Sequence, residues 1–478
     1  MPSLRRNIVY QFLYELLIVF IPLFTIPYVS RVLGAENIGL FSYTYAVANY
    51  FVLFANLGIK NYGSRTIAMV RNNKEELNRN FSEILSIHII FSIIVIFVYL
   101  VLLFFFVEDN LVIFLIQSIY VFAAVFDINW FFFGIEKFKL TVGRNTLVKI
   151  LSVFLVLVFV KTQTDLWIYA LILALSVFVG QSVVWFALKQ YVSWRRPSWA
   201  NMKQHIRPLF VLFLPILALS LYKYMDKIML GSISSNVQVG FYENAEKIIN
   251  VPMSLIMAFG VVLMPRIANM VTSKDKGEVF KLIDMSMEAV MLLAIAISFG
   301  LAGISFVLAP IFFGYEFEEC GILIMGLAVT VPFMAFANVI RTQYLIPYKE
   351  DKIFVVSLFL GAAVNLIVNI ILIPYMAARG AVIGTIFAEI IVCIYQSYFV
   401  RKKIFIKKYL LNTIPPILIG IVMFVFVFQI GNVMNINIVT LILQLLVGMF
   451  IYAVGVFLLM LKSRTQLMVL LRKFVVRY

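Results

Sequence analysis

The chain has 478 residues, of which 63% are hydrophobic and only 13% carry a charge. A bilayer-spanning helix needs about 20 largely apolar residues, so this composition supplies many spans and leaves little for water-soluble domains. A large catalytic domain on either face of the membrane is therefore excluded. The two cysteines, Cys320 and Cys393, are too few for a disulfide framework and do not form a metal-ligand pair. We expect no metal site.

Apolar runs along the sequence predict the membrane spans. Six runs precede a basic connector at residues 189–207, and they cover 8–30, 38–60, 82–107, 111–134, 146–161 and 166–188. Six more follow it, at 208–231, 238–264, 284–313, 320–346, 353–374 and 380–400. Two final runs, 409–430 and 436–461, precede a basic tail.

These runs predict an all-α polytopic membrane protein with about 14 transmembrane helices. We expect two pseudo-symmetric six-helix lobes, residues 1–200 and 201–404. Residues 405–478 would add two further helices and a basic cytoplasmic tail. The last two runs contain no charged residue between Tyr409 and Leu461, so they are expected at the lipid-facing periphery.

The placement of the net charge of +16 supports this order of spans. Cytoplasmic loops of membrane proteins are rich in lysine and arginine. With the amino terminus inside, the predicted cytoplasmic loops hold 30 of the 39 basic residues. An even number of helices with both termini in the cytoplasm follows. The basic charge is thus explained by membrane orientation, and no nucleic-acid partner is expected.

The two sets of six spans share a repeated spacing. Gly39 precedes Arg65 by 26 residues, and Gly240 precedes Arg266 by the same number. Each glycine lies at the turn between the first two spans of its set. Since both sets keep one orientation, the spacing indicates a parallel duplication, as in transporters with a central site between two lobes. The alternative is chance recurrence of glycine turns and basic helix ends.

Several segments, taken in order, resemble those of a known family. They are Pro27–Gly34 with Ile38 and Gly39, Leu57–Arg65, Asp127–Phe138, Asn365–Pro374 and Gly380–Thr385. Over nearly its whole length the chain resembles the Wzx-like polysaccharide flippases of the multidrug/oligosaccharidyl-lipid/polysaccharide exporter superfamily.

The resemblance implies a multi-pass protein of the bacterial cytoplasmic membrane. It would move undecaprenyl-pyrophosphate-linked oligosaccharide units from the cytoplasmic to the outer leaflet by alternating access, for capsule, O-antigen or teichoic-type polysaccharide. The protein would be a transporter and not an enzyme. Its partners would be the lipid-linked oligosaccharide, membrane lipids and, as a candidate, the polysaccharide polymerase machinery.

Charged residues inside the predicted spans are costly and mark candidate functional sites. The densest group lies on the seventh and eighth spans and comprises Lys223, Asp226, Lys227, Glu243, Glu246 and Lys247. Counted from the centre of the hairpin, the two halves of this group are predicted to lie at matching depths. An interhelical salt-bridge network is one interpretation, and snorkelling of helix-end lysines is another. The third is a watery cavity in which the lysines bind pyrophosphate and acidic sugars while the acids permit release.

Four further basic residues complete the candidate substrate-binding set: Arg31, Lys60, Arg65 and Arg341. Lys60 and Arg65 bracket the inner end of the second span, where they are candidates to receive the lipid pyrophosphate. Their alternative role is to anchor the helix end to anionic lipid headgroups. Arg31 follows two prolines and lies near the outer end of the first span.

Three acidic residues are candidates for ion coupling: Glu389, Asp127 and Glu288. Glu389 lies near the middle of the twelfth span and has no basic residue within four positions along the chain. Such an acid is expected to be protonated or to bind a cation, and its alternative role is a hydrogen bond to a neighbouring helix. No cofactor is expected, and a proton or sodium gradient is the candidate driving force.

Three rival functions stay open. A multidrug or cation antiporter of the same superfamily would prefer an acid-lined cavity, and a lipid II flippase would differ only in cargo. Likeness to lipid II flippases also makes the last two helices candidates to line a groove for an isoprenoid tail. A membrane glycosyltransferase or polymerase would present catalytic groups in a large outer loop, whereas every predicted outer loop has about ten residues or fewer. No phosphate-binding loop of the GxxxxGK[ST] type is present.

Overall fold

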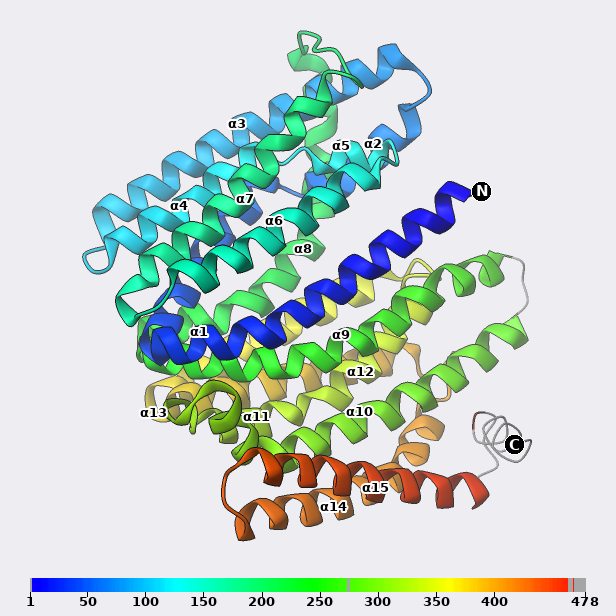
Figure 1. Ribbon diagram of the computed structural model, residues 1–478. Helices are drawn as coiled ribbons and strands as arrows, with labels where there is room; N and C mark the ends of the chain where they lie inside the picture. The colour runs from blue at the N-terminus through cyan, green and yellow to red at the C-terminus, as the bar shows by residue number, and fades with distance from the viewer. Residues whose placement is uncertain (1, 273–275, 463–466, 468–478) are drawn as a thin grey trace. The chain divides into compact units, whose positions relative to one another are not determined.

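A computed structural model describes residues 2–272, 276–462 and 467, and these residues form helices joined by turns and by one longer segment, 189–198 (Figure 1). In this part of the chain, 12 helices are long and apolar enough to cross a membrane, and no β-strand occurs. The predicted all-α polytopic membrane fold is confirmed. Of the basic tail expected after residue 462, only residue 467 belongs to the described residues.

Two of the membrane helices are double-length and kinked. Helix α1 (Pro2–Asn56) bends at Gly34, where φ is 76°, and α13 (Asp351–Val400) bends at Ala377, where φ is 48°. Both kinks fall in the gaps between predicted runs, 30–38 and 374–380. Each half of these helices therefore corresponds to one predicted span. The exact count of 14 and the cytoplasmic placement of both termini stay predictions.

The chain divides into two compact units, Met1–Gly231 and Ser232–Tyr478. The lobe boundaries expected near residues 200 and 404 stay predictions. After α1, the first unit contains α2 (Ile59–Val70), α3 (Lys74–Phe106), α4 (Leu111–Val125), α5 (Asn129–Gly134), α6 (Phe138–Phe159), the 3₁₀ turn η1 (Gln163–Asp165), α7 (Leu166–Leu188) and nearly all of α8 (Trp199–Ile233).

Within the first unit, α4 packs against α1, α3 and α7 (Figure 1). Large aromatic side chains fill the core beneath α2 and α5, with the rings of Phe81 and Trp130 stacked at 5.5 Å between centroids. Gly63 on α2 allows this packing, because a β-carbon there would lie 2.5 Å from the Trp130 ring. The core therefore fixes α2, α3 and α5 against one another.

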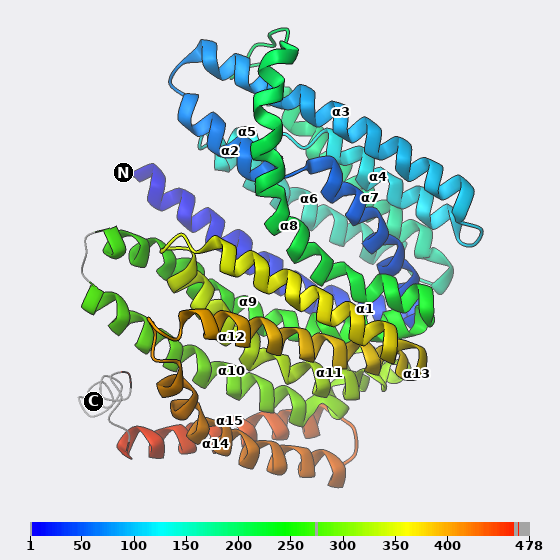
Figure 2. The same ribbon diagram turned by 180° about the vertical axis from the view of Figure 1, so that it is seen from behind.

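Helix α8 bends along its length (Figure 2) and contains Pro208 and Pro215. Each proline removes one backbone hydrogen bond from the helix and clashes with the preceding turn. Between α1 and α2 the chain turns through Gly58, whose φ is 72°. A β-carbon on Gly58 would lie 2.9 Å from the carbonyl oxygen of Leu209. The first half of α8 is thus packed backbone to backbone against this turn.

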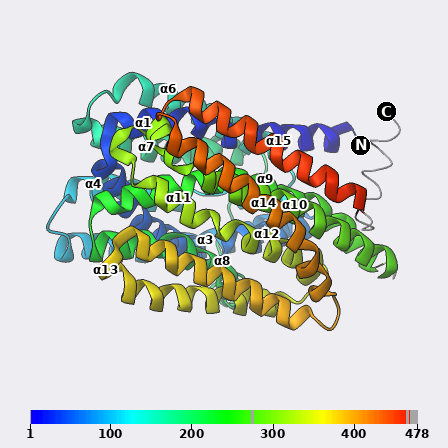
Figure 3. The ribbon, with the colours of Figure 1, turned by 90° about the horizontal axis from the view of Figure 1, so that it is seen from below.

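The second unit contains α9 (Asn236–Thr272), α10 (Lys276–Phe313), the 3₁₀ turn η2 (Tyr315–Phe317), α11 (Cys320–Ala328), α12 (Thr330–Ile340), the π-helix η3 (Arg341–Leu345), α13, α14 (Ile406–Val433) and α15 (Ile438–Lys462). Helix α10 packs against α11, α12 and α14, and α14 packs against α15. Figure 3 shows α14 and α15 side by side in this unit.

Close packing and one buried amide hold the last two helices together. Gly448 of α15 faces Val427 of α14, where a β-carbon would lie 3.1 Å from a Val427 methyl carbon. The buried Gln444 side chain donates to the carbonyl oxygen of Val427 at 2.8 Å. The two additional helices predicted from the sequence are confirmed by α14 and α15. Their large exposed apolar surface agrees with the predicted contact with lipid.

Candidate functional site

Lys223 is the accessible charge of the predicted lysine cluster in the first unit. Its side chain is exposed on α8, and its ammonium group lies over the ring of Tyr224, 5.3 Å from the centroid. The Tyr224 ring in turn meets Tyr50 of α1 edge to face at 5.9 Å. A cation held over an aromatic ring keeps its charge available to an anion.

Further aromatic side chains continue this face along the second half of α1. Tyr45 lies within electrostatic reach of Lys223 and Tyr224, and its ring meets Tyr120 at 5.1 Å and Phe41 at 5.7 Å. We call Phe41, Tyr45, Tyr50, Lys223 and Tyr224 the lysine–tyrosine face; Tyr120 of α4 is buried and packs against the Tyr45 ring. The face combines one ammonium group with hydroxyl groups and flat apolar rings, which suits a ligand with an anionic head and sugar rings.

Asp226 and Lys227 differ from Lys223 because both are buried, with exposed fractions of 4% and 7%. Both have interaction partners, and Asp226 lies within electrostatic reach of Tyr50. Buried charges of this kind are stable only when paired. Their burial makes Asp226 and Lys227 less accessible to a ligand than Lys223, and the interpretation of the cluster as an ion-pair network stays a prediction.

In the second unit, Lys247 pairs with Glu243 one helical turn away on α9, with 3.1 Å between Nζ and Oε1. The Lys247 side chain is one-third exposed and Glu243 is less so. Glu246 also has an interaction partner. The sequence predicts that these residues lie at the same membrane depth as Lys223 and Lys227. Because the two groups belong to different units, this stays a prediction.

Lys60 and Arg65 lie on the exposed side of α2, opposite the buried residues Ile59, Gly63 and Ile67. The Ser64 hydroxyl donates to the carbonyl oxygen of Lys60 at 2.6 Å. Because both basic side chains are exposed, they are available to a ligand or to lipid headgroups. Arg31 is likewise exposed, on the first half of α1, and has an interaction partner.

Arg341 and Glu389 come together in the second unit although 48 residues separate them. Arg341 opens the π-helix η3, donates to Asn338 Oδ1 at 2.6 Å and lies over the Phe354 ring. Glu389 on α13 is 6% exposed and lies within electrostatic reach of the guanidinium group. The acid that lacks a basic neighbour along the chain thus has one in the fold. Turns of π-helix are frequent at functional sites.

Asp127 and Glu288 occupy different surroundings. Asp127 Oδ1 accepts hydrogen bonds from the backbone and side-chain nitrogens of Asn129, the first residue of α5, at 3.0 and 2.7 Å. Glu288 is half-buried on α10 and lines a small cavity next to Tyr409 and Pro416 of α14. Asp127 is thus engaged by a neighbour along the chain, whereas Glu288 borders a space large enough for water; for both, ion coupling stays a prediction.

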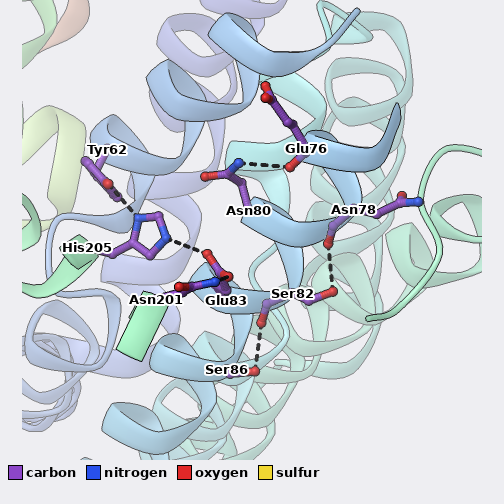
Figure 4. A network of polar contacts seen from close by, with 9 residues as sticks. All are labelled: Tyr62, Glu76, Asn78, Asn80, Ser82, Glu83, Ser86, Asn201 and His205. Atoms are coloured by element: carbon purple, nitrogen blue, oxygen red, sulfur yellow. Dashed lines mark hydrogen bonds and ion pairs between the residues drawn. The ribbon is translucent and has the colours of Figure 1, made fainter. Parts of the chain in front are cut away.

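A buried polar network in the first unit was missed by sequence reasoning. Glu83 of α3 and His205 of α8 have exposed fractions of 1% and 3%, with 3.0 Å between Oε2 and Nε2. The Tyr62 hydroxyl of α2 lies 2.6 Å from His205 Nδ1, and Asn201 donates to Glu83 Oε1 at 3.0 Å (Figure 4). Glu83 falls at the start of a predicted span, so the one available signal was an acid inside an otherwise apolar run.

An apolar cavity of about 350 Å³ lies among α10, α11, α12 and α14 in the second unit. Ile295 and Ala302 of α10, Phe333 of α12 and Phe424 of α14 contribute to its lining. In the described residues, no group of three or more His, Cys, Asp or Glu side chains is arranged to hold a metal ion.

Comparison with known proteins gives a consistent result. Over 408 residues the chain is 24% identical to the "Putative O-antigen transporter" of Shigella dysenteriae, covering 82% of this chain and 99% of the relative. It is 26% identical over 408 residues to the "Putative O-antigen transporter" of Escherichia coli (strain K12), covering 84% and 97%. A solved structure of the lipid II flippase MurJ, in an inward closed conformation, has the same fold. Its TM-score is 0.74 at 15% identity, over 94% of this chain and 97% of that chain.

A family model described as "Polysaccharide biosynthesis protein" matches residues 4–271, which is more than half of the chain. The match covers the first unit with its lysine–tyrosine face and extends along α9. The chain therefore belongs to the polysaccharide biosynthesis protein family.

Proposed function

We propose that the protein is a flippase of the bacterial cytoplasmic membrane that moves undecaprenyl-pyrophosphate-linked oligosaccharide units from the cytoplasmic to the outer leaflet by alternating access. The similarity to O-antigen transporters, over 82% and 84% of the chain, supports the cargo class. The observation that carries the proposal is the exposed Lys223 ammonium group set among tyrosines.

The chemistry of the lysine–tyrosine face fits this cargo. A pyrophosphate diester carries negative charge that an ammonium group binds as a point charge without demanding one orientation. Sugar rings have apolar faces that lie flat on aromatic rings and hydroxyl groups that hydrogen-bond to tyrosines. One accessible lysine binds such a head without holding it permanently, which suits a carrier that must release its cargo.

Exposed basic residues on α2 supply a first contact for the cargo. Lys60 and Arg65 lie on α2, which follows the predicted cytoplasmic end of the second span (38–60), and both are open to a diphosphate headgroup. In the second unit, Glu389 beside Arg341 is the proposed site of coupling to a proton or sodium gradient, because a buried acid near a guanidinium group changes its interactions when it binds a cation. We also propose that transport involves no covalent chemistry. The protein would in addition associate with a polysaccharide polymerase.

Binding of undecaprenyl pyrophosphate to the purified protein in nanodiscs tests the role of Lys223. The Lys223→Ala variant is expected to bind about tenfold more weakly, equivalent to about 1.4 kcal/mol, and Lys223→Arg is expected to retain binding. Lys189→Ala is the matched control, because Lys189 is an exposed lysine just after α7 in the same unit. Equal affinity for all four proteins would overturn the assignment of Lys223.

A cation antiporter is the second candidate, and the same aromatic side chains favour it. Tyrosine rings attract organic cations as well as sugars, whereas the Lys223 charge repels them. An organic cation that binds the wild type, and binds more tightly after Lys223→Ala, would favour this candidate. Competition by undecaprenyl pyrophosphate alone favours the flippase.

A further inference from the structure

The Glu83–His205 pair is buried in the core of the first unit, away from the lysine–tyrosine face. Leu77, Phe81, Ile84, Leu85, Met202 and Leu209 form part of the apolar cluster around these stretches of α3 and α8. Burying an ionisable acid and an ionisable base together is costly unless each has a partner. Here each has two partners: Glu83 contacts His205 and Asn201, and His205 contacts Glu83 and Tyr62.

The hydrogen bonds of the network can be kept in two protonation states. With a neutral imidazole, Nε2–H donates to Glu83 and the Tyr62 hydroxyl donates to Nδ1. With an imidazolium, Nε2–H still donates to Glu83, while Nδ1–H donates to the Tyr62 oxygen, since a phenol is both donor and acceptor. One proton therefore enters or leaves without the loss of a hydrogen bond.

What changes between the two states is the net charge in the core. The carboxylate with an imidazolium is neutral overall, whereas the carboxylate with a neutral imidazole leaves one buried negative charge. An uncompensated buried charge is strongly unfavourable, and water that reaches the site relieves it. Closed packing around the pair consequently favours the state that holds the proton.

The other groups hydrogen-bonded to the pair are uncharged, and the charged residues of α2, Lys60 and Arg65, are exposed. Tyr62 on α2 is within hydrogen-bond reach of His205, and Asn201 on α8 is neutral. Charged residues on adjacent turns are exposed to the surroundings: Arg79 on α3, and Lys203 and Arg207 on α8. Arg195, in the segment before α8, pairs with the exposed Glu75.

The network lies where it can control α8. It joins the first turns of α8 to α2 and α3, and one turn later Leu209 packs against Gly58. Pro208 and Pro215 follow, and beyond them the same helix carries Lys223. A change in the attachment of the first turns is passed through a segment weakened by two prolines to the substrate-binding lysine.

We infer that Glu83 and His205 form a proton-binding site that fastens the first half of α8 to α2 and α3 while it holds a proton, and loosens it when the proton leaves. The ligand is the proton itself, exchanged with water when this part of the unit opens. The effect on Lys223 rests on the proposed function, but proton binding does not. This site is separate from Glu389 in the second unit.

Histidine NMR tests the site directly, because the chain has only two histidines, His88 and His205. The ¹⁵N-histidine-labelled protein is measured in nanodiscs from about pH 5 to about pH 9. His88→Gln removes the other signal and is the matched control, since His88 is also buried on α3, five residues after Glu83. We expect an imidazolium signal from His205 that persists to higher pH in this variant than in the double variant His88→Gln with Glu83→Gln.

Backbone hydrogen exchange of residues 199–213, corrected for the pH dependence of intrinsic exchange rates, tests whether proton loss loosens the first half of α8. In the wild type we expect protection to fall as His205 loses its proton, and in Glu83→Gln the protection should no longer depend on pH. Tyr62→Phe is the second variant, used if Glu83→Gln does not fold, because it leaves Glu83 and His205 in place. It should keep the His205 imidazolium but reduce the protection of residues 199–213 from exchange. A His205 signal that stays neutral throughout, or exchange independent of pH in the wild type, would overturn the inference. Loss of flipping with normal His205 titration would count against the proposed function and leave the proton site standing.

Discussion

The Tyr43 ring of α1 packs directly against the backbone of Gly231 at the far end of α8, where a β-carbon would collide with the ring. This contact brings the two helices that carry the lysine–tyrosine face together. Since α1 supplies Tyr45 and Tyr50 while α8 supplies Lys223 and Tyr224, the geometry of the face depends on the contact.

Gly231→Ala is therefore expected to destabilise the protein and weaken ligand binding together. Overpacking a tight contact costs about 1–3 kcal/mol, and thermal unfolding in detergent measures the effect. Gly143→Ala on α6 is the control, because no atom lies within 4 Å of a β-carbon there. Alanine in place of a helical glycine adds about 0.5–1 kcal/mol, so this variant should unfold at the same or a slightly higher temperature. An unchanged melting temperature for Gly231→Ala would contradict the close packing.

The two lysines of α8 should behave differently when mutated. Lys223→Ala removes an exposed charge, so it is expected to reduce translocation in step with the weaker binding while leaving protein abundance intact. Lys227→Ala removes a buried charge that has partners, which costs about 3–5 kcal/mol and should reduce abundance. Abundance in membranes and flipping in liposomes are the two measurements. Loss of abundance for both variants would favour a purely structural network.

Glu389→Gln is expected to remove the dependence of transport on an ion gradient. The amide keeps the shape of the side chain but neither takes up a proton nor attracts a cation, so Arg341 keeps one fixed neighbour. Flipping is measured with and without an imposed proton or sodium gradient, and Glu319→Gln serves as an acid-to-amide control because Glu319 pairs with Arg379 in an exposed bridge. Gradient dependence that survives in Glu389→Gln would discard Glu389 as the coupling residue.

A substitution in the apolar cavity among α10, α11, α12 and α14 tests whether the last helices contact the lipid tail. Ala302→Phe adds a ring to its lining and is expected to slow flipping of a full-length undecaprenyl substrate more than that of a short-chain analogue. The cavity has room for only part of such a tail. Equal slowing of both substrates would mean that the helices serve packing alone.

Hydropathy predicted the helices well, because each span is a local property of the sequence. The kinks at Gly34 and Ala377 fall between predicted runs for the same reason: polar and small residues there interrupt the apolar pattern. Identification of the superfamily rested on turn and packing residues in a fixed order, and the family match agrees with it.

The partners of buried charges were not predictable in this way. Glu83 and His205 are 122 residues apart, and Arg341 and Glu389 are 48 apart, so neither pair leaves a local pattern. The burial of Lys227 beside the exposed Lys223 was equally hidden. Helical spacing places the two lysines on one face, but tertiary packing decides which of them is covered.

Transport by the purified protein in liposomes tests the central claim most directly. A labelled undecaprenyl-pyrophosphate oligosaccharide, labelled lipid II and a cationic dye are compared in parallel, with and without an imposed ion gradient. The account predicts flipping of the undecaprenyl-pyrophosphate oligosaccharide, with that activity reduced in Lys223→Ala and unchanged in Lys189→Ala. Movement of the dye alone, or of lipid II alone, would contradict it.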